Sequence, residues 1–202
     1  MNPLASATSQ PRALLVLEDG TTFEGRCCGA SGETFGEIVF NTSMTGYQEI
    51  ISDPSYAGQI VTLTYPQVGN YGIDPAVMQR DVLHLRGFVV HDMCYEPSNW
   101  TSKQSLPEFL QENGVVAIEG IDTRALTMHL RDYGAQKAAI STEDLDPAHL
   151  LARVQASPNI SEHNFVPDVS VDAPHVVSAT SKKRFNVVAY DCGEKNGMLQ
   201  GL

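Results

Sequence analysis

The chain has 202 residues, with 13 Lys or Arg against 24 Asp or Glu, and its formal net charge is −11 at pH 7. This length is enough for one large domain, or for one domain and part of a second. The acidic surplus argues against nucleic acids and anionic membrane surfaces as binding partners.

The N-terminal region shows no signal for export or membrane insertion. Its first apolar run, residues 13–17, is too short for the core of a signal peptide and has little positive charge before it. No other stretch approaches the ~20 apolar residues of a membrane-spanning helix. We therefore expect a cytoplasmic protein, with residues 1–12 as a polar, disordered leader.

Residues 13–156 are expected to fold as one mixed α/β domain. A hairpin opens it, since Asp19-Gly20 separates residues 13–18 from 21–26 and favours a tight turn. Later strands are expected where apolar and β-branched residues cluster, at 36–40, 59–65, 83–93, 115–119 and 135–140. Helices are expected after the capping residues Ser105, Asp122 and Asp146, at 106–112, 123–132 and 147–156.

The strand at 36–40 leads into the stretch around which the chain is organised, FNTSMTGYQEIISDPSY at residues 40–56. Thr45 followed by Gln48 predicts the start of a short helix. Asp53-Pro54 ends that helix, because proline lacks an N–H group and restricts the residue before it. Ser55 and Tyr56 are therefore expected on a turn that faces a ligand or another subunit.

Composition changes after residue 156. Residues 157–184 contain Pro158, Pro167 and Pro174 among many small polar residues without apolar periodicity, which is typical of a linker. Residues 185–190 predict a strand, and a turn at 192–197 leads toward a helix. This order is that of the first unit of a doubly wound α/β domain, which is cut off at residue 202.

The cysteines are at positions 27, 28, 94 and 192, without a CxxC pair or a histidine at zinc-finger spacing. We interpret them as small buried thiols in a reducing compartment. Cys192 follows a predicted strand, but Tyr190 and Glu194 occupy the positions where a nucleophile elbow has glycine. Cys192 is therefore a poor candidate for a nucleophile, and the cysteines predict no metal site.

Residues 40–72, FNTSMTGYQEIISDPSYAGQIVTLTYPQVGNYG, resemble the N-terminal domain of the small (glutaminase) subunit of glutamine-dependent carbamoyl phosphate synthetase. The resemblance continues through GVVAI at 114–118, GIDTRALT at 120–127 and VVAYD at 187–191. It implies a β/β/α swivelling-type N-terminal domain, then a linker, then the first strand of a truncated class I glutamine amidotransferase domain.

In that family the small subunit hydrolyses glutamine, and the ammonia passes to a large subunit that makes carbamoyl phosphate from bicarbonate and ATP for arginine and pyrimidine biosynthesis. The resemblance implies the large subunit and L-glutamine as partners, with ATP and magnesium on the large subunit and no cofactor in this chain. The family's glycine-flanked catalytic cysteine and its His-x-Glu motif do not occur in these 202 residues. The chain alone is therefore expected to be inactive, and to contribute subunit docking and one side of the glutamine site.

One ligand residue of the family matches this chain. The serine of the DPSY turn is Ser55, and the resemblance implies that it contacts glutamine from across the domain boundary. From the residues alone, a turn serine that bonds its own backbone is the alternative. The chain also departs from the family, because Cys192 replaces the usual aromatic residue after YD and Gly197 weakens the next helix by ~1 kcal/mol.

Two other functions stay open from the sequence. An autonomous, non-catalytic interaction module would dock a large partner and would require no second domain. An independent enzyme would use the hydroxyl groups of Ser43 and Ser55, but it needs a base, and no histidine lies between Met1 and Leu83.

Overall fold

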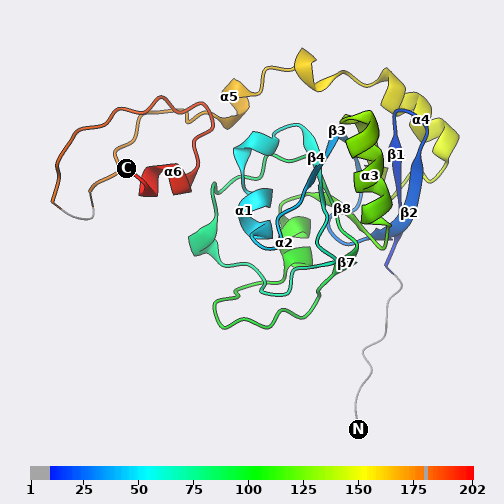
Figure 1. The fold of residues 1–202 in the computed structure, drawn as a ribbon, viewed down its shortest axis with the longest axis horizontal. Helices are drawn as coiled ribbons and strands as arrows, with labels where there is room; N and C mark the ends of the chain where they lie inside the picture. The colour runs from blue at the N-terminus through cyan, green and yellow to red at the C-terminus, as the bar shows by residue number, and fades with distance from the viewer. Residues whose placement is uncertain (1–9, 180–181) are drawn as a thin grey trace, which may run out of the picture.

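The computed structural model describes residues 10–179 and 182–202, which form a mixed α/β structure around a closed seven-stranded barrel with the strand order β1-β2-β8-β6-β4-β3-β9 (Figure 1). The barrel strands are β1 (Arg12–Leu17), β2 (Thr22–Cys27), β3 (Glu33–Asn41), β4 (Gln59–Leu63), β6 (Gly87–Val89), β8 (Val116–Glu119) and β9 (Gln136–Ser141). β5 (Gln67–Val68) and β7 (Asp92–Met93) form a separate two-stranded sheet.

The helices are α1 (Tyr47–Ile51), α2 (Leu106–Glu112), α3 (Thr123–Tyr133), α4 (Pro147–Ala156), α5 (Val166–Val169) and α6 (Asn196–Gln200). Short 3-10 turns add η1 (Pro54–Tyr56), η2 (Pro75–Val77) and η3 (Ile160–Glu162). The expected helices 106–112, 123–132 and 147–156 are confirmed as α2, α3 and α4, and Ser105, Asp122 and Asp146 each accept a backbone N–H bond as their N-caps. Within the described residues, no helix is both long and apolar enough to cross a membrane.

The barrel has an antiparallel half and a parallel half. β1 and β2 form the expected hairpin across Gly20, whose φ of 91° is the left-handed conformation that such a turn requires. β9 pairs with both β1 and β3 and closes the barrel. On the other side, β3, β4, β6 and β8 run parallel to one another.

Apolar side chains fill the barrel and cover two parts of its outer surface. Leu15, Ile38 and Ile118 are fully buried in the interior cluster, which also includes Leu126 and Leu130 of α3. A second cluster joins the outer face of the parallel strands to α1 and α2, which lie side by side in Figure 1. The third joins α4 to β1 and β9 on the opposite flank.

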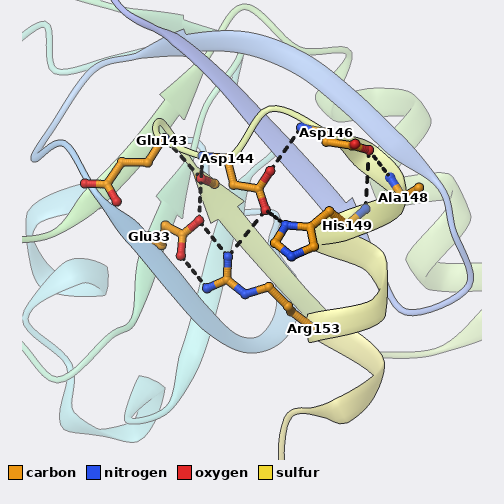
Figure 2. A network of polar contacts seen from close by, with 8 residues as sticks. Glu33, Glu143, Asp144, Asp146, Ala148, His149 and Arg153 are labelled. Carbon is orange, nitrogen blue, oxygen red and sulfur yellow. Dashed lines mark hydrogen bonds and ion pairs between the residues drawn. The ribbon is translucent and has the colours of Figure 1, made fainter.

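A polar network holds α4 to the barrel in addition to its apolar contacts (Figure 2). The Arg153 guanidinium on α4 donates to both carboxylate oxygens of Glu33 on β3, at 3.0 and 2.5 Å. Asp144, in the loop after β9, accepts from Arg153 at 3.4 Å and lies 2.6 Å from the His149 ring. The hydroxyl of Ser141 donates to Glu33 at 2.9 Å.

The single strand expected at 83–93 is two short strands. Parallel pairing of β6 with β4 and β8 extends only from Gly87 to Val89. The chain then leaves the barrel, and Asp92 and Met93 pair with β5 instead. The expectation was wrong because a strand continues only as far as its neighbours supply backbone partners.

The strand expected at 185–190 is also wrong. These residues have no regular secondary structure, and Phe185, Val188 and Tyr190 are 79%, 84% and 93% exposed. A β-strand requires the hydrogen bonds of a neighbouring strand. In the described part of the chain, none lies beside this segment.

The structure describes only part of the segments that were expected to be the leader and the linker. Residues 1–9 of the leader 1–12 lie outside the described residues, whereas Arg12 belongs to β1. Residues 180 and 181 of the linker 157–184 also lie outside them. The remaining linker contains η3 and α5 and crosses the barrel from α4 toward the side of α1 (Figure 1).

Candidate functional site

Ser55 lies in the middle of η1, at the surface. Asp53 is the N-cap of this turn, and its Oδ1 atom accepts a hydrogen bond of 2.9 Å from the backbone N–H of Ser55. Pro54 fits the next position because it has no N–H to satisfy. Among the described residues the Ser55 hydroxyl has no hydrogen-bond partner, so it is available to a ligand.

Residues on both sides of Ser55 line a polar pocket of about 300 Å³. Its lining consists of Asn41, Glu49, Ile50, Asp53, Tyr56, Gln79 and Lys195. Asn41, at the end of β3, donates its side-chain amide to the Tyr56 hydroxyl at 2.9 Å. The pocket therefore joins the end of a barrel strand, the helix α1, the turn η1 and a residue from the C-terminal segment.

The start of α1 differs from the expectation that Thr45 caps it. The N-cap is Gly46, with φ of 84° and no side-chain cap bond. The backbone N–H groups of Gly46 and Tyr47 donate to the Tyr71 hydroxyl at 2.9 and 3.0 Å. A tyrosine from a distant loop thus satisfies the helix end in place of Thr45.

Two buried polar side chains of this region, Gln48 and Ser52, hold the loop after β5. The Gln48 amide bonds both the N–H and the C=O of Asp74, accepting from the N–H at 2.8 Å. The Ser52 hydroxyl accepts from the N–H of Gln79 at 2.9 Å. α1 therefore fixes the loop that brings Gln79 into the pocket.

The C-terminal segment supplies Lys195, whose ammonium lies 3.1 Å from Oδ2 of Asp53. Asp53 therefore holds the Ser55 backbone with one oxygen and pairs with Lys195 through the other. The sequence singled out Ser55 as the candidate ligand residue and Asp53 only as part of the helix stop, and it did not single out Asn41, Gln79 or Lys195. No local pattern marks these three residues, because only the fold brings them together.

The described residues do not combine a nucleophile with a base at this pocket. The four cysteines are free, and Cys27 and Cys28 are buried. Burial is the largest cause of a pKa for the Cys28 thiol well above its ordinary value, so this thiol stays protonated. The expectation of buried thiols was wrong for the other two, since Cys94 is half-buried and Cys192 is exposed, on a segment that packs little against the barrel. No cysteine of the described chain hydrogen-bonds to a histidine.

A smaller pocket of about 220 Å³ contains Ser43, on which the hydroxyl-based enzyme hypothesis depended. Its other lining residues are Met44, Thr45, Tyr47, Ile50, Leu63, Tyr65, Gln67, Val68, Asn70 and Tyr71. Neither pocket is lined by histidine. Across residues 10–179 and 182–202, no three His, Cys, Asp or Glu side chains converge as metal ligands do.

Comparison with known sequences finds a family whose match extends over the barrel. The family described as "Carbamoyl-phosphate synthase small chain, CPSase domain" matches residues 15–140, which run from β1 to β9. The carbamoyl phosphate synthase small chain of Syntrophotalea carbinolica is 46% identical over 203 residues, covering 95% of this chain and 54% of that protein. Those of Nitratidesulfovibrio vulgaris and Thermotoga maritima are 53% and 49% identical, covering 81% and 95% of this chain.

The chain spans about half the length of these curated relatives. The match covers the barrel, the FNTSMTGYQEIISDPSY stretch and the turn that carries Ser55. Because the family match extends over residues 15–140, more than half of the chain, the chain belongs to the carbamoyl-phosphate synthase small chain family.

Proposed function

We propose that this chain is the N-terminal portion of the small subunit of a glutamine-hydrolysing carbamoyl phosphate synthetase. In this proposal the complete small subunit releases ammonia from glutamine, and a large subunit uses that ammonia with bicarbonate and ATP to make carbamoyl phosphate. The chain contributes docking to the large subunit and one side of the glutamine site. The catalytic cysteine belongs to a following domain.

The observation that carries the proposal is that Ser55, in a chain of this family, lies beside a polar pocket. Its hydroxyl has no partner among the described residues, and the neighbouring Asp53 and Tyr56 line a polar pocket that Lys195 reaches from the far end of the chain. An α-amino acid with an amide side chain requires hydroxyl, amide and charged partners of this kind. We assign Ser55 as the hydrogen-bonding partner of L-glutamine.

The finer assignment of the fold belongs to the same proposal. The barrel domain with outer helices corresponds to the swivelling-type N-terminal domain, and residues 185–202 to the start of a doubly wound amidotransferase domain. The exposed apolar run at 185–190, followed by a turn and α6, supports this assignment. Such a run would become the first strand once a neighbouring strand pairs with it.

The remaining parts of the proposal concern the complex. ATP and magnesium bind the large subunit, this chain binds neither nucleic acid nor membrane, and the complex works in the cytoplasm in the supply of arginine and pyrimidine precursors. The acidic net charge of −11 supports the exclusion of nucleic acid. The alternative of an autonomous interaction module is not favoured, since relatives that share up to 53% identity are about twice as long.

The test is co-purification of this chain with the large subunit of a carbamoyl phosphate synthetase, together with an assay of ammonia release. Specific interfaces bury ~1,200–2,000 Å², so a stable complex is expected at micromolar concentration. The chain alone is expected to release no ammonia from glutamine. Ser55→Ala is the matched control, because it alters the proposed glutamine site and should co-purify equally well.

Separate elution of the two proteins would contradict the docking part of the proposal. Ammonia release by the purified chain above the buffer blank would contradict the absence of a catalytic group.

A further inference from the structure

Arg80 joins three segments that lie far apart in the sequence. Its Nη2 atom donates to the two carboxylate oxygens of Asp191 at 2.8 and 2.7 Å, and to the C=O of Val169 in α5 at 3.0 Å. The Arg80 and Asp191 side chains are only 19% and 6% exposed. A charge pair removed from water to this extent persists only with good geometry and several hydrogen bonds.

Asp191 also organises the backbone that follows it. Its Oδ1 atom accepts hydrogen bonds of 2.8 Å from the N–H groups of both Gly193 and Glu194. Burial acts to raise the pKa of Asp191, but these N–H groups and the Arg80 guanidinium outweigh it and the pKa is lowered. Asp191 is therefore ionised throughout the neutral range and holds Arg80 and the turn at the same time.

The residues after this turn bind the loop residues that directly precede Arg80. The N–H of Asn196 donates to the C=O of Gln79 at 3.1 Å, and its side-chain amide donates to the C=O of Met78 at 2.9 Å. The N–H of Gly197 donates to the Gln79 side chain at 3.1 Å. Residues 78–80 and 191–197 thus form a matched polar contact along their length.

The contact also depends on shape. Gly193 has φ of 101°, and a Cβ atom there would lie 2.9 Å from Cγ2 of Val169. A residue with a side chain would be strained and would push the turn away from α5. α5 itself is held by Phe165, whose ring packs against Gly58 beside η1.

From these contacts we infer that Arg80 and Asp191 form a latch that positions the turn carrying Lys195 against Asp53, the N-cap of the turn that carries Ser55. Both are positioning residues that act through Lys195 and Asp53. This inference rests on the proposed function, because it explains how Lys195 is held beside Asp53 in the proposed glutamine pocket. It adds that two residues of this chain that do not line the pocket fix the position of Lys195.

The first experiment measures amide hydrogen exchange in the 202-residue chain. Arg80→Ala removes the charge-assisted hydrogen bonds that hold Asp191, and such bonds are the stronger ones, so the whole turn should open more often. Exchange at Gly193, Glu194, Asn196 and Gly197 should therefore accelerate by about tenfold. Exchange in α4 should be unchanged. Arg131→Ala is the matched control, because Arg131 is an exposed arginine paired only with its neighbour Asp132 among the described residues.

Asp191→Asn gives an independent route to the same result. The variant keeps an acceptor oxygen for the turn but loses the charge that binds Arg80. Residue 191 lies outside the barrel. It should loosen residues 193–197 without changing exchange in the barrel strands. Unchanged exchange at 193–197 in both variants would overturn the latch.

The second experiment measures steady-state kinetics of the full-length subunit in its complex with the large subunit. Arg80→Ala should raise the KM for glutamine and leave ammonia-dependent synthesis unchanged, while Arg80→Lys, which keeps the charge, should recover part of the affinity. A raised KM in Ser55→Ala with an unchanged KM in Arg80→Ala would overturn the positioning role. An unchanged KM in Ser55→Ala would instead refute the proposed glutamine contact, and the exchange measurement would still decide the latch.

Discussion

Asp53 is the residue at which the local and the distant contacts of the pocket meet. One carboxylate oxygen holds the N–H of Ser55 and the other pairs with Lys195. The first contact comes from a position two residues along the chain and the second from the C-terminal segment. Only the contact with Ser55 could be predicted from the local sequence.

We expect Asp53→Ala to lower the free energy of unfolding by about 1 kcal/mol, because η1 loses its N-cap. Urea denaturation of the purified chain measures this change. Asp132→Ala removes a surface carboxylate of α3 that is 53% exposed and should leave the midpoint almost unchanged. Equal midpoints for Asp53→Ala and the unmodified chain would show that the cap carries no stability.

At the residue scale, the sequence predicted those caps whose partners are local. Ser105 forms the expected capping box with Glu108, in which each side chain bonds the other residue's backbone N–H. The prediction that Thr45 caps α1 was wrong because the partner of the α1 N-terminus is Tyr71. No local pattern specifies a tyrosine from another loop. The same reason applies to Arg80 and Asp191, whose pairing spans most of the chain.

At the scale of elements, α4 is a helix whose attachment depends on charge as well as on apolar packing. The pKa of Glu33 is lowered, and the largest cause is its hydrogen bonds from Arg153. Burial acts in the opposite direction and raises this pKa, but by less. A carboxylate whose pKa is lower in the folded state stabilises the fold above its ordinary value of 4.5, and the stabilisation is lost as the pH falls through the lowered pKa. Acid should therefore loosen the contact between α4 and β3.

We predict that the urea midpoint of the unmodified chain falls more steeply between about pH 5 and pH 3 than that of Glu33→Gln. The glutamine variant lacks the ionisable group, so this part of the pH dependence should disappear. Glu24→Gln is the control, since the Arg12–Glu24 pair is exposed on both sides and should contribute little. Parallel pH profiles for Glu33→Gln and the unmodified chain would contradict the role of this network.

The elements themselves were largely predictable, but their limits were not. Asp19-Gly20 was sufficient to predict the hairpin of β1 and β2, since its pairing is local. The run at 83–93 has strand composition throughout, yet it divides where the barrel partners end. The run at 185–190 has the same composition and forms no strand, which shows that composition alone does not supply a partner.

At the scale of the whole molecule, barrel closure was beyond prediction from the sequence. β9 pairs with β1 through contacts such as Leu15 with Ile140, and periodicity does not indicate which distant strands will meet. The resemblance of residues 40–72 implied a domain type, but it did not identify the latch that leads from the barrel to residues 191–197.

This architecture predicts where a protease cuts first. Residues 157–181 contain no Lys or Arg, and Lys182, Lys183 and Arg184 are exposed. Limited digestion with trypsin should therefore cut first at 182–184 and leave the barrel intact, as mass spectrometry of the early products would show. A first cut at Lys137, which is 11% exposed and paired with Glu18, would contradict the stability assigned to β9.

The central claim is that Ser55 binds glutamine from this half of the small subunit, and Ser55→Ala in the full-length subunit bound to the large subunit tests it most directly. Loss of one hydrogen bond of ~0.5–1.5 kcal/mol should raise the KM for glutamine by at most roughly tenfold. Ammonia-dependent synthesis of carbamoyl phosphate should be unchanged, as should both activities in the matched control Ser43→Ala. An unchanged KM for glutamine, with lower thermal stability and equal losses from both nitrogen sources, would contradict the account.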